Sequence, residues 1–311
     1  MTKHQLLLSM TGLVLLGTGW LLGAGLPSLT NRSEATLVAT TAPVLVPAHT
    51  KPSDLVAVKM TTVMTTGDLV VSEDGWITSF SQTINGAPES ELRFSWIFDT
   101  SQHDPYCPAS PRVVFVMSLE KVPDVSFAPG YGYFVKKGTK IQILGGFANF
   151  SDHDYPSASL TARLTFTPAS SGKHLGNAYP LFLNALCDSL FVVPPHKTVV
   201  KNLPKPFTVP FAGRIVLLAS HAHDFAKEIS LTLNGQEIWN TSPLHTPDGK
   251  NLGNPEYWTP FNGVALKEGD TLGLKETYVN PTDNPAAAMS SMYIQIVPTS
   301  PGDGAVTGMQ M

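Results

Sequence analysis

An internal repeat is the feature of this 311-residue chain that most restricts its fold. A lysine-glycine turn sequence occurs twice, as Val135-Lys136-Lys137-Gly138 and as Leu266-Lys267-Glu268-Gly269. In each copy an asparagine follows the glycine by eleven residues, Asn149 in the first copy and Asn280 in the second. Each copy indicates a tight turn, a strand, a polar turn and another strand. The repeat therefore predicts two sandwich domains of similar topology rather than one large sheet.

Short β-type runs separated by turns occur in both halves of the chain. The 26 prolines, the 25 glycines and the many Val, Thr and Ser residues suit an all-β chain, and few stretches keep a helical period for three turns. The runs of the first half are Leu55–Val63, Trp76–Thr83, Leu92–Phe98, Arg112–Met117, Lys140–Leu144 and Leu160–Phe166, and a second series extends from Leu190 to Val297. We predict a first β-sandwich over residues 55–170, a second over 171–298, a loop-rich join near 169–187 and a disordered tail at 299–311.

The N-terminal segment is apolar and contains no charge from Leu6 to Leu26. About twenty such residues are enough to span a bilayer, whereas a cleaved signal peptide usually has a shorter core and a small-residue cleavage site. We favour an uncleaved membrane anchor over residues 1–29, with a cleaved signal segment as the alternative, and a Thr/Ala/Val/Pro-rich linker over 30–54. Both alternatives place the rest of the chain on the extracytoplasmic side, in the periplasm or at the cell surface.

The charge and the cysteine content limit the kinds of partner and of cysteine chemistry that we expect. Charged residues make up 14% of the chain, the formal net charge is -4, and no basic patch stands out, so nucleic acid is not an expected partner. Cys107 and Cys187 are the two cysteines and form no CxxC motif, which argues against a zinc knuckle or a redox motif. For an exported chain we favour one disulfide between them, worth roughly 4 kcal/mol, over two free buried thiols.

The clearest candidate site is the stretch Ser220-His221-Ala222-His223-Asp224. It follows an apolar run, Arg214–Ala219, that is typical of a strand. Side chains at i and i+2 of a strand point to the same face, so the two imidazoles can lie side by side at a strand end. Imidazole is a common copper and zinc ligand, and a thioether such as that of Met289 selects copper, above all Cu(I). Two solvated histidines at a strand end are the alternative.

Three motifs of the second half resemble the C-terminal domain of the copper type II, ascorbate-dependent monooxygenases, the family of peptidylglycine alpha-hydroxylating monooxygenase. They are His221-Ala222-His223, Lys267-Glu268-Gly269-Asp270-Thr271-Leu272 and Met289-Ser290-Ser291-Met292-Tyr293-Ile294. The resemblance implies two tandem jelly-roll-like β-sandwiches and one copper bound by His221, His223 and Met289, with Tyr293 as a packed neighbour. Met292 is the competing thioether, and we choose Met289 because the family places the ligand four residues before the tyrosine.

The first half resembles the family's N-terminal domain more faintly, through Ala128-Pro129-Gly130-Tyr131-Gly132, Lys137-Gly138 and Phe147-Ala148-Asn149. The family places an adjacent histidine pair on an early strand of that domain and a third histidine before the Asn turn. This chain has no histidine between His49 and His103, and the third position falls at about Gly146. The resemblance therefore implies that the electron-supplying copper is lost, which puts the family's hydroxylation in doubt and leaves open whether the chain is an enzyme.

The remaining histidines, His103, His153, His174, His196 and His245, are expected to be solvated loop residues. Among them His153, in Asp152-His153-Asp154, is the best candidate for a second metal. Asp224 fits either an acceptor that orients an imidazole or a turn residue. Glu276 and Tyr278 fit packing and function equally well.

Three interpretations of the function remain open from the sequence. The first is a membrane-anchored, extracytoplasmic copper-binding protein with a monooxygenase-like fold, one copper per chain and oxidation retained or lost. The second is a non-catalytic β-sandwich module, such as an accessory subunit beside a membrane-protein partner. A structural pair of sandwiches without metal is the third alternative.

Overall fold

The computed structural model describes residues 34–48, 62–118, 124–149, 151–187, 190–243 and 257–300. The chain divides into two compact units, Met1–Asn31 and Arg32–Met311, and all described residues belong to the second unit. Their regular structure is β-strand apart from two short 3-10 turns, η1 (Glu89–Glu91) and η2 (Ala169–Ser171), which confirms the prediction of an all-β chain. None of these residues forms a helix that could cross a membrane. The predicted anchor at 1–29 and the predicted tail beyond residue 300 lie outside the described residues.

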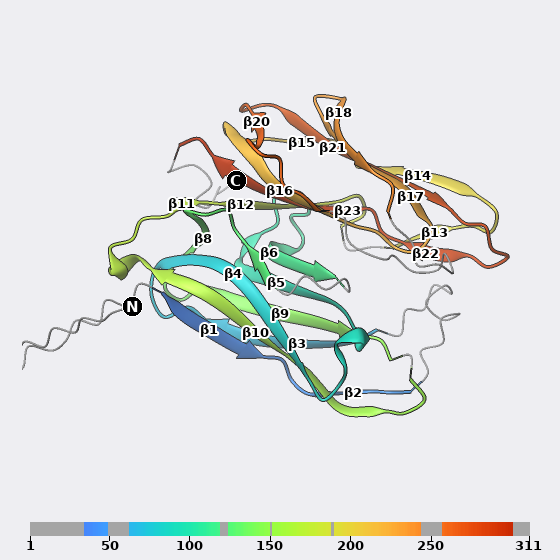
Figure 1. The fold of residues 1–311 in the computed structure, drawn as a ribbon, viewed down its shortest axis with the longest axis horizontal. Coiled ribbons are helices and arrows are strands. Elements are labelled where there is room, and N and C mark those ends of the chain that lie inside the picture. Colours follow the sequence, from blue (N-terminus) through green and yellow to red (C-terminus); the bar gives the residue numbers. More distant parts are fainter. Residues whose placement is uncertain are drawn as a thin grey trace, which may run out of the picture. The chain divides into compact units, whose positions relative to one another are not determined.

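The first sandwich contains two sheets, coloured mostly blue to light green in Figure 1, whose strands pair antiparallel except for the parallel pair β8-β11. The strands of the larger sheet are, in spatial order, β1 (Ala35–Thr40), β10 (Tyr155–Pro168), β4 (Gly75–Asn85), β8 (Tyr131–Val135) and β11 (Gly176–Asn177), with β2 (Val44–Val46) paired to β10 and β7 (Asp124–Ser126) paired to β4. Those of the smaller sheet are β3 (Val63–Val70), β9 (Lys140–Phe147), β5 (Leu92–His103) and β6 (Pro111–Ser118). Alternate apolar residues of both sheets, such as Ile141 and Ile143 of β9 and Leu160 and Leu164 of β10, are fully buried in one core.

The N-terminal edge of this sandwich corrects our sequence analysis. We expected residues 30–54 to form a linker, but β1 and β2 both pair with β10 and extend the larger sheet. Their outward residues are exposed, Val38 and Leu45 to 53% each, so these edge strands lack the strong hydrophobic alternation of an inner strand. The sequence signal was therefore too weak to distinguish a strand from a spacer. The predicted run Leu55–Val63 lies outside the described residues except for its last two positions.

The second sandwich has the same two-sheet plan and is coloured yellow-green to red in Figure 1. One sheet contains β12 (Tyr179–Asn184), β23 (Ser291–Pro298), β16 (Gly213–His221) and β19 (Tyr257–Trp258), with β20 (Val264–Leu266) also paired to β16. The facing sheet contains β14 (Thr198–Asn202), β21 (Thr271–Val279), β17 (Ala226–Leu233) and β18 (Gln236–Thr241), with β15 (Phe207–Thr208) paired to β21. β13 (Phe191–Val193) and β22 (Ala286–Ala288) form a separate two-stranded sheet.

The two asparagines of the sequence repeat, Asn149 and Asn280, make equivalent hydrogen bonds. Each buried side-chain amide donates to the carbonyl of an earlier strand and to the carbonyl of the residue four positions on. Each amide oxygen accepts the backbone N–H and the hydroxyl of the residue two positions on. The partners are Val46, His153 and Ser151 in the first copy and Val193, Asn284 and Thr282 in the second. The repeat in the sequence is therefore a repeat in the structure.

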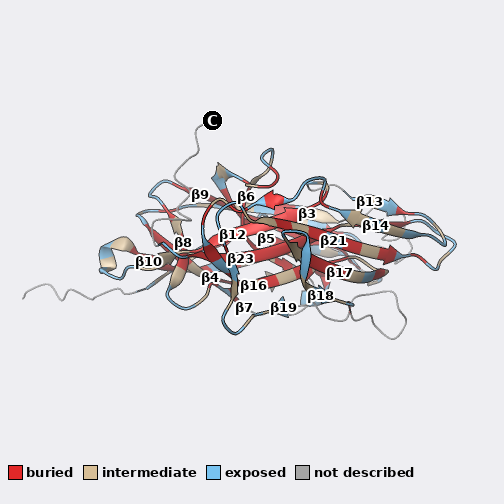
Figure 2. Cartoon of the chain, turned by 90° about the horizontal axis from the view of Figure 1, so that it is seen from above, coloured by how far each residue is buried: buried red, intermediate tan, exposed pale blue. Residues whose placement is uncertain are grey.

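An apolar cluster joins the smaller sheet of the first sandwich to the β12-β23 sheet of the second. Its buried members are Phe98, Val113, Phe182 and Tyr293. The Trp96 ring packs edge-on against Phe182, with centroids 5.0 Å apart, and the Tyr293 hydroxyl donates to the Val114 carbonyl at 2.8 Å. Every residue of β12 and β23 is buried, as Figure 2 shows, because both faces of these strands are covered.

The loop between β5 and β6 enters the core of the second sandwich. Tyr106 and Cys107 belong to that core, and the Tyr106 hydroxyl donates to the Lys205 carbonyl at 3.0 Å. Cys107 forms a disulfide with Cys187, with Cα atoms 5.4 Å apart, which confirms the predicted bond. Asp104 shapes the loop, since one carboxylate oxygen accepts the N–H groups of Tyr106 and Cys107. The first sandwich thus contributes side chains to the interior of the second.

A buried arginine also crosses this junction. Arg112 of β6 is 1% exposed, donates to the Pro180 carbonyl at 2.9 Å and lies 4.2 Å from the centroid of the Tyr179 ring. Burial raises the pKa of the Asp104 carboxyl, and the positive charge of Arg112 partly opposes that shift. Arg112 therefore contributes a hydrogen bond between the sandwiches and a counter-charge to the loop that carries Cys107.

Candidate metal centre

The histidine pair lies at the end of β16, as the sequence predicts. His221 is the last residue of the strand and pairs with Ser291 of β23, while His223 follows the strand. The ring centroids are 5.3 Å apart and the ring planes are nearly perpendicular, at 86°. The turn after the pair is constrained, because Ala226 N–H donates to the His223 carbonyl and Phe225 adopts a left-handed φ of 71°, which is unusual for a bulky residue. The structure thus brings two imidazoles together on a fixed turn.

Both imidazoles are held in the neutral form that binds metals. Burial lowers the pKa of His221 to about 3, and the neighbouring His223 and Arg93 act in the same direction. Burial also lowers the pKa of His223 to about 4, although the nearby Ala287 carbonyl opposes that shift. The Nδ1 of His223 lies 3.3 Å from this carbonyl oxygen, so Nδ1 carries the proton and the Nε2 lone pair is available.

Met289 lies in the turn between β22 and β23, and its backbone and that of His223 both bond to the hydroxyl oxygen of Tyr278. The hydroxyl oxygen of Tyr278 accepts the His223 N–H at 3.2 Å and bonds to the Met289 carbonyl. The Met289 side chain is partly buried. The structure therefore gathers the backbones of the predicted sulfur ligand and one predicted nitrogen ligand around the Tyr278 hydroxyl.

Met292, the competing thioether, is fully buried in the core of the second sandwich. It pairs with Ser220, whereas His221 pairs with Ser291 one position along, so Met292 and His221 point to opposite faces of the sheet. Tyr293 is on the other face from Met292 and lines a recess together with His221.

That recess lies between the sandwiches. Its aromatic walls come from Phe182, Tyr257 and Tyr293, and the complete lining is Val116, Phe182, Ala219, Ser220, His221, Tyr257 and Tyr293. Val116 belongs to the first sandwich, and the other lining residues belong to the second. The recess therefore places aromatic and small side chains next to His221 on the side of the first sandwich.

Two buried residues of β21, Glu276 and Tyr278, support the site, and their role was left open by the sequence. Glu276 is 0% exposed; one carboxyl oxygen accepts the Ser291 N–H at 3.0 Å and the other lies 3.0 Å from the Tyr278 hydroxyl. The inward positions of β21 are Leu272, Leu274, Glu276 and Tyr278. A carboxyl group at an inward position of such an alternating strand needs a polar partner in the core. That position of Glu276 was the sequence signal that could have indicated the network.

Gly146, where the resemblance expects a histidine of the first copper site, lies against an aromatic ring. A Cβ atom on Gly146 would lie 2.5 Å from the Phe94 ring, so a histidine there would collide with it. The Phe94 ring itself packs against Trp96, with centroids 6.1 Å apart. Within the described ranges, no group of three or more His, Cys, Asp and Glu side chains is arranged to hold a metal ion.

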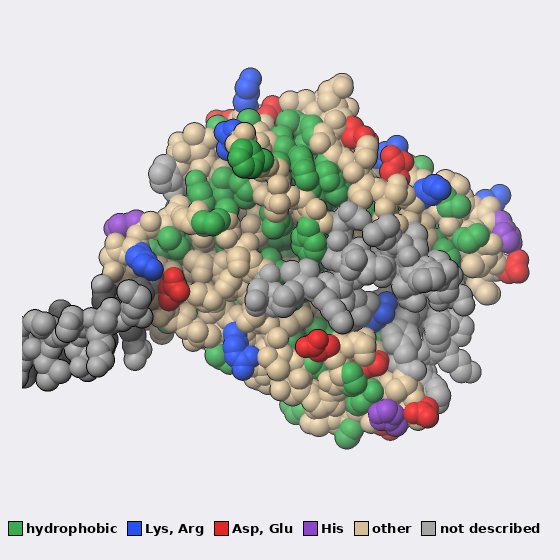
Figure 3. All heavy atoms as spheres, in the orientation of Figure 1, with side chains coloured by type: hydrophobic (Ala, Val, Ile, Leu, Met, Phe, Trp, Pro, Cys, Tyr) green, Lys and Arg blue, Asp and Glu red, His purple; other side chains and the backbone are tan. Residues whose placement is uncertain are grey.

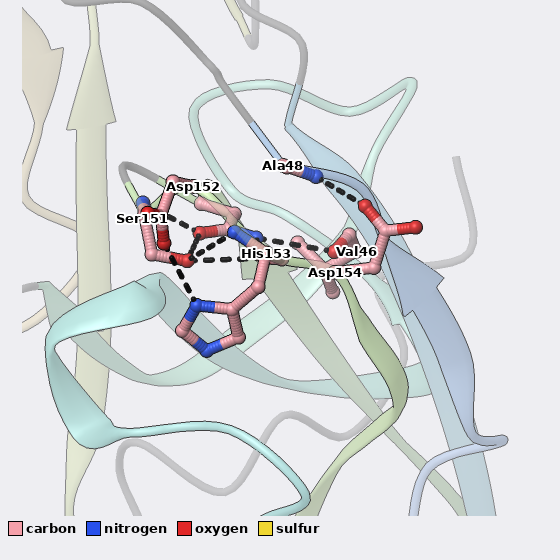
Figure 4. A network of polar contacts seen from close by, with 7 residues as sticks. Val46, Ala48, Ser151, Asp152, His153 and Asp154 are labelled. Atoms are coloured by element: carbon pink, nitrogen blue, oxygen red, sulfur yellow. Dashed lines mark hydrogen bonds and ion pairs between the residues drawn. The ribbon is translucent and has the colours of Figure 1, made fainter.

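The loop histidines are exposed where the structure describes them. His153 lies 3.2 Å from Asp152, both side chains are largely exposed, and Asp154 instead accepts the Ala48 N–H, as Figure 4 shows. His196 pairs with Asp283 at 2.8 Å on the surface, and His103 and His174 are exposed. Asp224 lies in the turn after His223 and is partly buried, and His245 lies outside the described residues. The expectation of solvated loop histidines is confirmed for His153, His174 and His196, whereas the exposed His103 is the last residue of β5.

The fold and the site define a tandem β-sandwich protein with a neutral histidine pair beside the junction of its sandwiches. No protein-family model matches the chain, and no curated protein is similar to it. Solved structures with a similar fold include the major capsid protein P2 of bacteriophage PM2, at 11% identity and a TM-score of 0.39, covering 86% of this chain and 98% of that one. Another is PNGase F, a glycosylasparaginase from Flavobacterium meningosepticum, at 10% identity and a TM-score of 0.42, covering 86% and 97%. These similarities lie in the β-sandwich architecture alone.

The depressed histidine pKa values predict acid sensitivity of the metal-free protein. Because the folded pKa values of His221 and His223 lie below the ordinary 6.5, the unfolded chain binds more protons below pH 6.5. The free energy of unfolding should therefore fall as the pH decreases from 6.5 to about 3. We expect His221→Gln to remove about 1–2 kcal/mol of that loss, measured by urea unfolding at pH 7 and pH 4.5. The control is His196→Gln, and identical losses in all three proteins would contradict the assignment.

Proposed function

We propose that this chain is an extracytoplasmic copper-binding protein that holds one copper per chain with His221, His223 and Met289. The observation that carries the proposal is the Tyr278 hydroxyl, which bonds to the backbones of both His223 and Met289. Neutral imidazoles and a thioether form a donor set that suits copper and, through the sulfur, favours Cu(I). Copper at such a site supplies a centre that can change between Cu(I) and Cu(II).

The charge around the site supports the same oxidation state. Arg93 lies close enough to the histidine pair for its positive charge to lower the pKa of both rings. A positive charge destabilises a divalent cation more than a monovalent one at the same distance. The two neutral imidazoles would supply the nitrogen donors, and the apolar walls of the recess would limit access of water to His221.

The filled position at Gly146 favours a binding or copper-handling role over coupled hydroxylation. The resembled enzymes need a second copper that supplies an electron. At Gly146, where the resemblance expects one of its ligands, a side chain would meet the Phe94 ring. A non-catalytic accessory subunit of a membrane complex is therefore the second candidate function. The charges on the face drawn in Figure 3 are scattered and of both signs.

Metal analysis after copper loading tests the proposal. The full chain, loaded with Cu(I) under reducing conditions that spare the disulfide and then freed of excess metal, should retain one copper per chain. Zinc should compete weakly, because it gains little from the thioether. Absence of retained copper, or equal retention of zinc in competition, would contradict the proposed donor set.

The membrane assignment predicts how the chain fractionates. Because the run from Leu6 to Leu26 is long and uncharged, the full-length protein should stay in the membrane fraction after alkaline washing. Deletion of residues 1–29 should move it to the soluble fraction. If expression of the full-length sequence gave a soluble product whose mature N-terminus lies near Ser33, the segment would be a cleaved signal. The disulfide supports export, since such bonds persist in oxidising compartments.

A further inference from the structure

Three segments of the second sandwich meet at the side chains of Glu276 and Tyr278. Glu276 bonds to the backbone N–H of Ser291, the first residue of β23. Tyr278 bonds to the backbone N–H of His223 and to the carbonyl of Met289. Both side chains are 0% exposed. The pair therefore fixes the turn that contains Met289 from two sides and ties it to the histidine turn.

The protons in this network can be counted. The Tyr278 hydroxyl has one proton and three polar neighbours: the His223 N–H, the Met289 carbonyl and a Glu276 carboxyl oxygen. The His223 N–H donates its own proton to the Tyr278 oxygen. The Met289 carbonyl has no proton to donate, so the Tyr278 proton must lie in the hydrogen bond to Met289. The contact with Glu276 then needs a proton from the carboxyl group. Only a neutral Glu276 satisfies all three contacts at once.

Burial supports the same protonation state. Removal from water raises the pKa of the Glu276 carboxyl well above its ordinary value, and the contacts with the Tyr278 hydroxyl and the Ser291 N–H only partly oppose that shift. Within the described residues, Glu276 takes part in none of the ion pairs. An ionised carboxylate there would take the tyrosine proton and leave the Met289 carbonyl facing an oxygen without a hydrogen between them.

We propose that Glu276 is a neutral carboxylic acid that positions Met289 against His223 and thereby sets the preference of the site for Cu(I). The link to copper rests on the proposed function. The sulfur of Met289 is the soft donor of the proposed set, so its placement affects Cu(I) more than Cu(II). Glu276 is a positioning residue, because it acts through Tyr278 and the β23 backbone.

Two substitutions at Glu276 separate positioning from packing. Glu276→Gln keeps the shape and can donate to Tyr278 and accept from Ser291, so it should retain the wild-type affinities for Cu(I) and Cu(II). Glu276→Leu removes both bonds and should weaken Cu(I) binding by about 10- to 100-fold, with a smaller effect on Cu(II). Tyr278→Phe keeps the ring but removes the hydroxyl, so this variant should also lose the preference for Cu(I). A glutamine variant as weak as the leucine variant would overturn the neutral acid.

Infrared spectroscopy of the metal-free protein at neutral pH tests the protonation state without copper. The difference spectrum between wild type and Glu276→Gln should contain the carbonyl band of a protonated carboxyl group. A carboxylate band in its place would overturn the inference even if copper binds. Conversely, a protein that shows the protonated band but binds no copper would refute the proposed function and the link to Cu(I), and the neutral carboxylic acid would stand.

Discussion

Tight copper binding should be lost when His221 and His223 are both replaced by alanine. The two rings lie 5.3 Å apart and supply the nitrogen donors of the proposed set, and a single thioether does not hold copper tightly. Each single substitution should also abolish tight binding, because one imidazole and one sulfur leave the metal two-coordinate. The measurement is copper content after loading and gel filtration, together with competition against a chelator of known affinity.

The structure offers a matched control for this experiment. His153 and His196 are exposed loop histidines that lie beside Asp152 and Asp283, so a double alanine variant at these two positions removes the same number of imidazoles. That variant should retain one copper. Equal copper content in wild type and in the His221/His223 variant would refute the site. A second copper that persists in that variant would show that another site exists.

The two methionines provide a second contrast within the same site. Met289→Leu should weaken Cu(I) binding and leave Cu(II) binding largely intact. Met292→Leu should change copper affinity little and affect stability instead, since Met292 is fully buried in the core. The reverse order of the two effects on Cu(I) would transfer the sulfur ligand to Met292.

Removal of the disulfide should be the largest single change in stability. Cys107 and Cys187 are 80 residues apart, and closing a loop of that length restricts the unfolded chain by about 4.5 kcal/mol in the chain-entropy model. The variant with alanine at both positions should have a free energy of unfolding lower by about that amount in urea titrations. Wild-type protein unfolded in the presence of a thiol reductant should show the same loss.

Loss of the disulfide should also weaken copper binding. Cys187 lies close to Ala185, whose N–H donates to the Ser290 carbonyl at 2.9 Å, directly after Met289. We expect the reduced protein to bind Cu(I) less tightly, because this contact helps to fix the methionine turn. A double-alanine variant that unfolds at the wild-type urea concentration would show that the bond contributes little to stability.

The sequence predicted those features that depend on local pattern. Eleven-residue spacing identified the repeat, and the alternation before His221 placed the histidine pair at a strand end. The two cysteines paired as expected because the chain offers no other partner. These predictions needed only residue types and their spacing in the sequence.

The features that were missed depend on contacts between distant segments. β1 and β2 are edge strands whose outward residues are exposed, so their pairing with β10 left little trace in the pattern. Arg93 belongs to the first sandwich, yet its charge acts on the histidine pair of the second. The bond from Tyr278 to the His223 backbone spans 55 residues. No local pattern encodes such proximity. A carboxyl residue at an inward position of an alternating strand, as at Glu276, could still have indicated a buried polar network.

The loop that carries Tyr106 and Cys107 also bears on how the protein is made. A ribosome synthesises these two residues before any strand of the sandwich whose core they enter. Until the C-terminal half emerges, an aromatic ring and a reactive thiol remain without their final neighbours, which exposes the nascent chain to aggregation and to wrong disulfides. Conversely, the C-terminal half produced alone would have a hole where the ring belongs. The second sandwich therefore depends on the first for part of its core, and the C-terminal half is not an autonomous module that evolution or a cloning strategy could exchange intact.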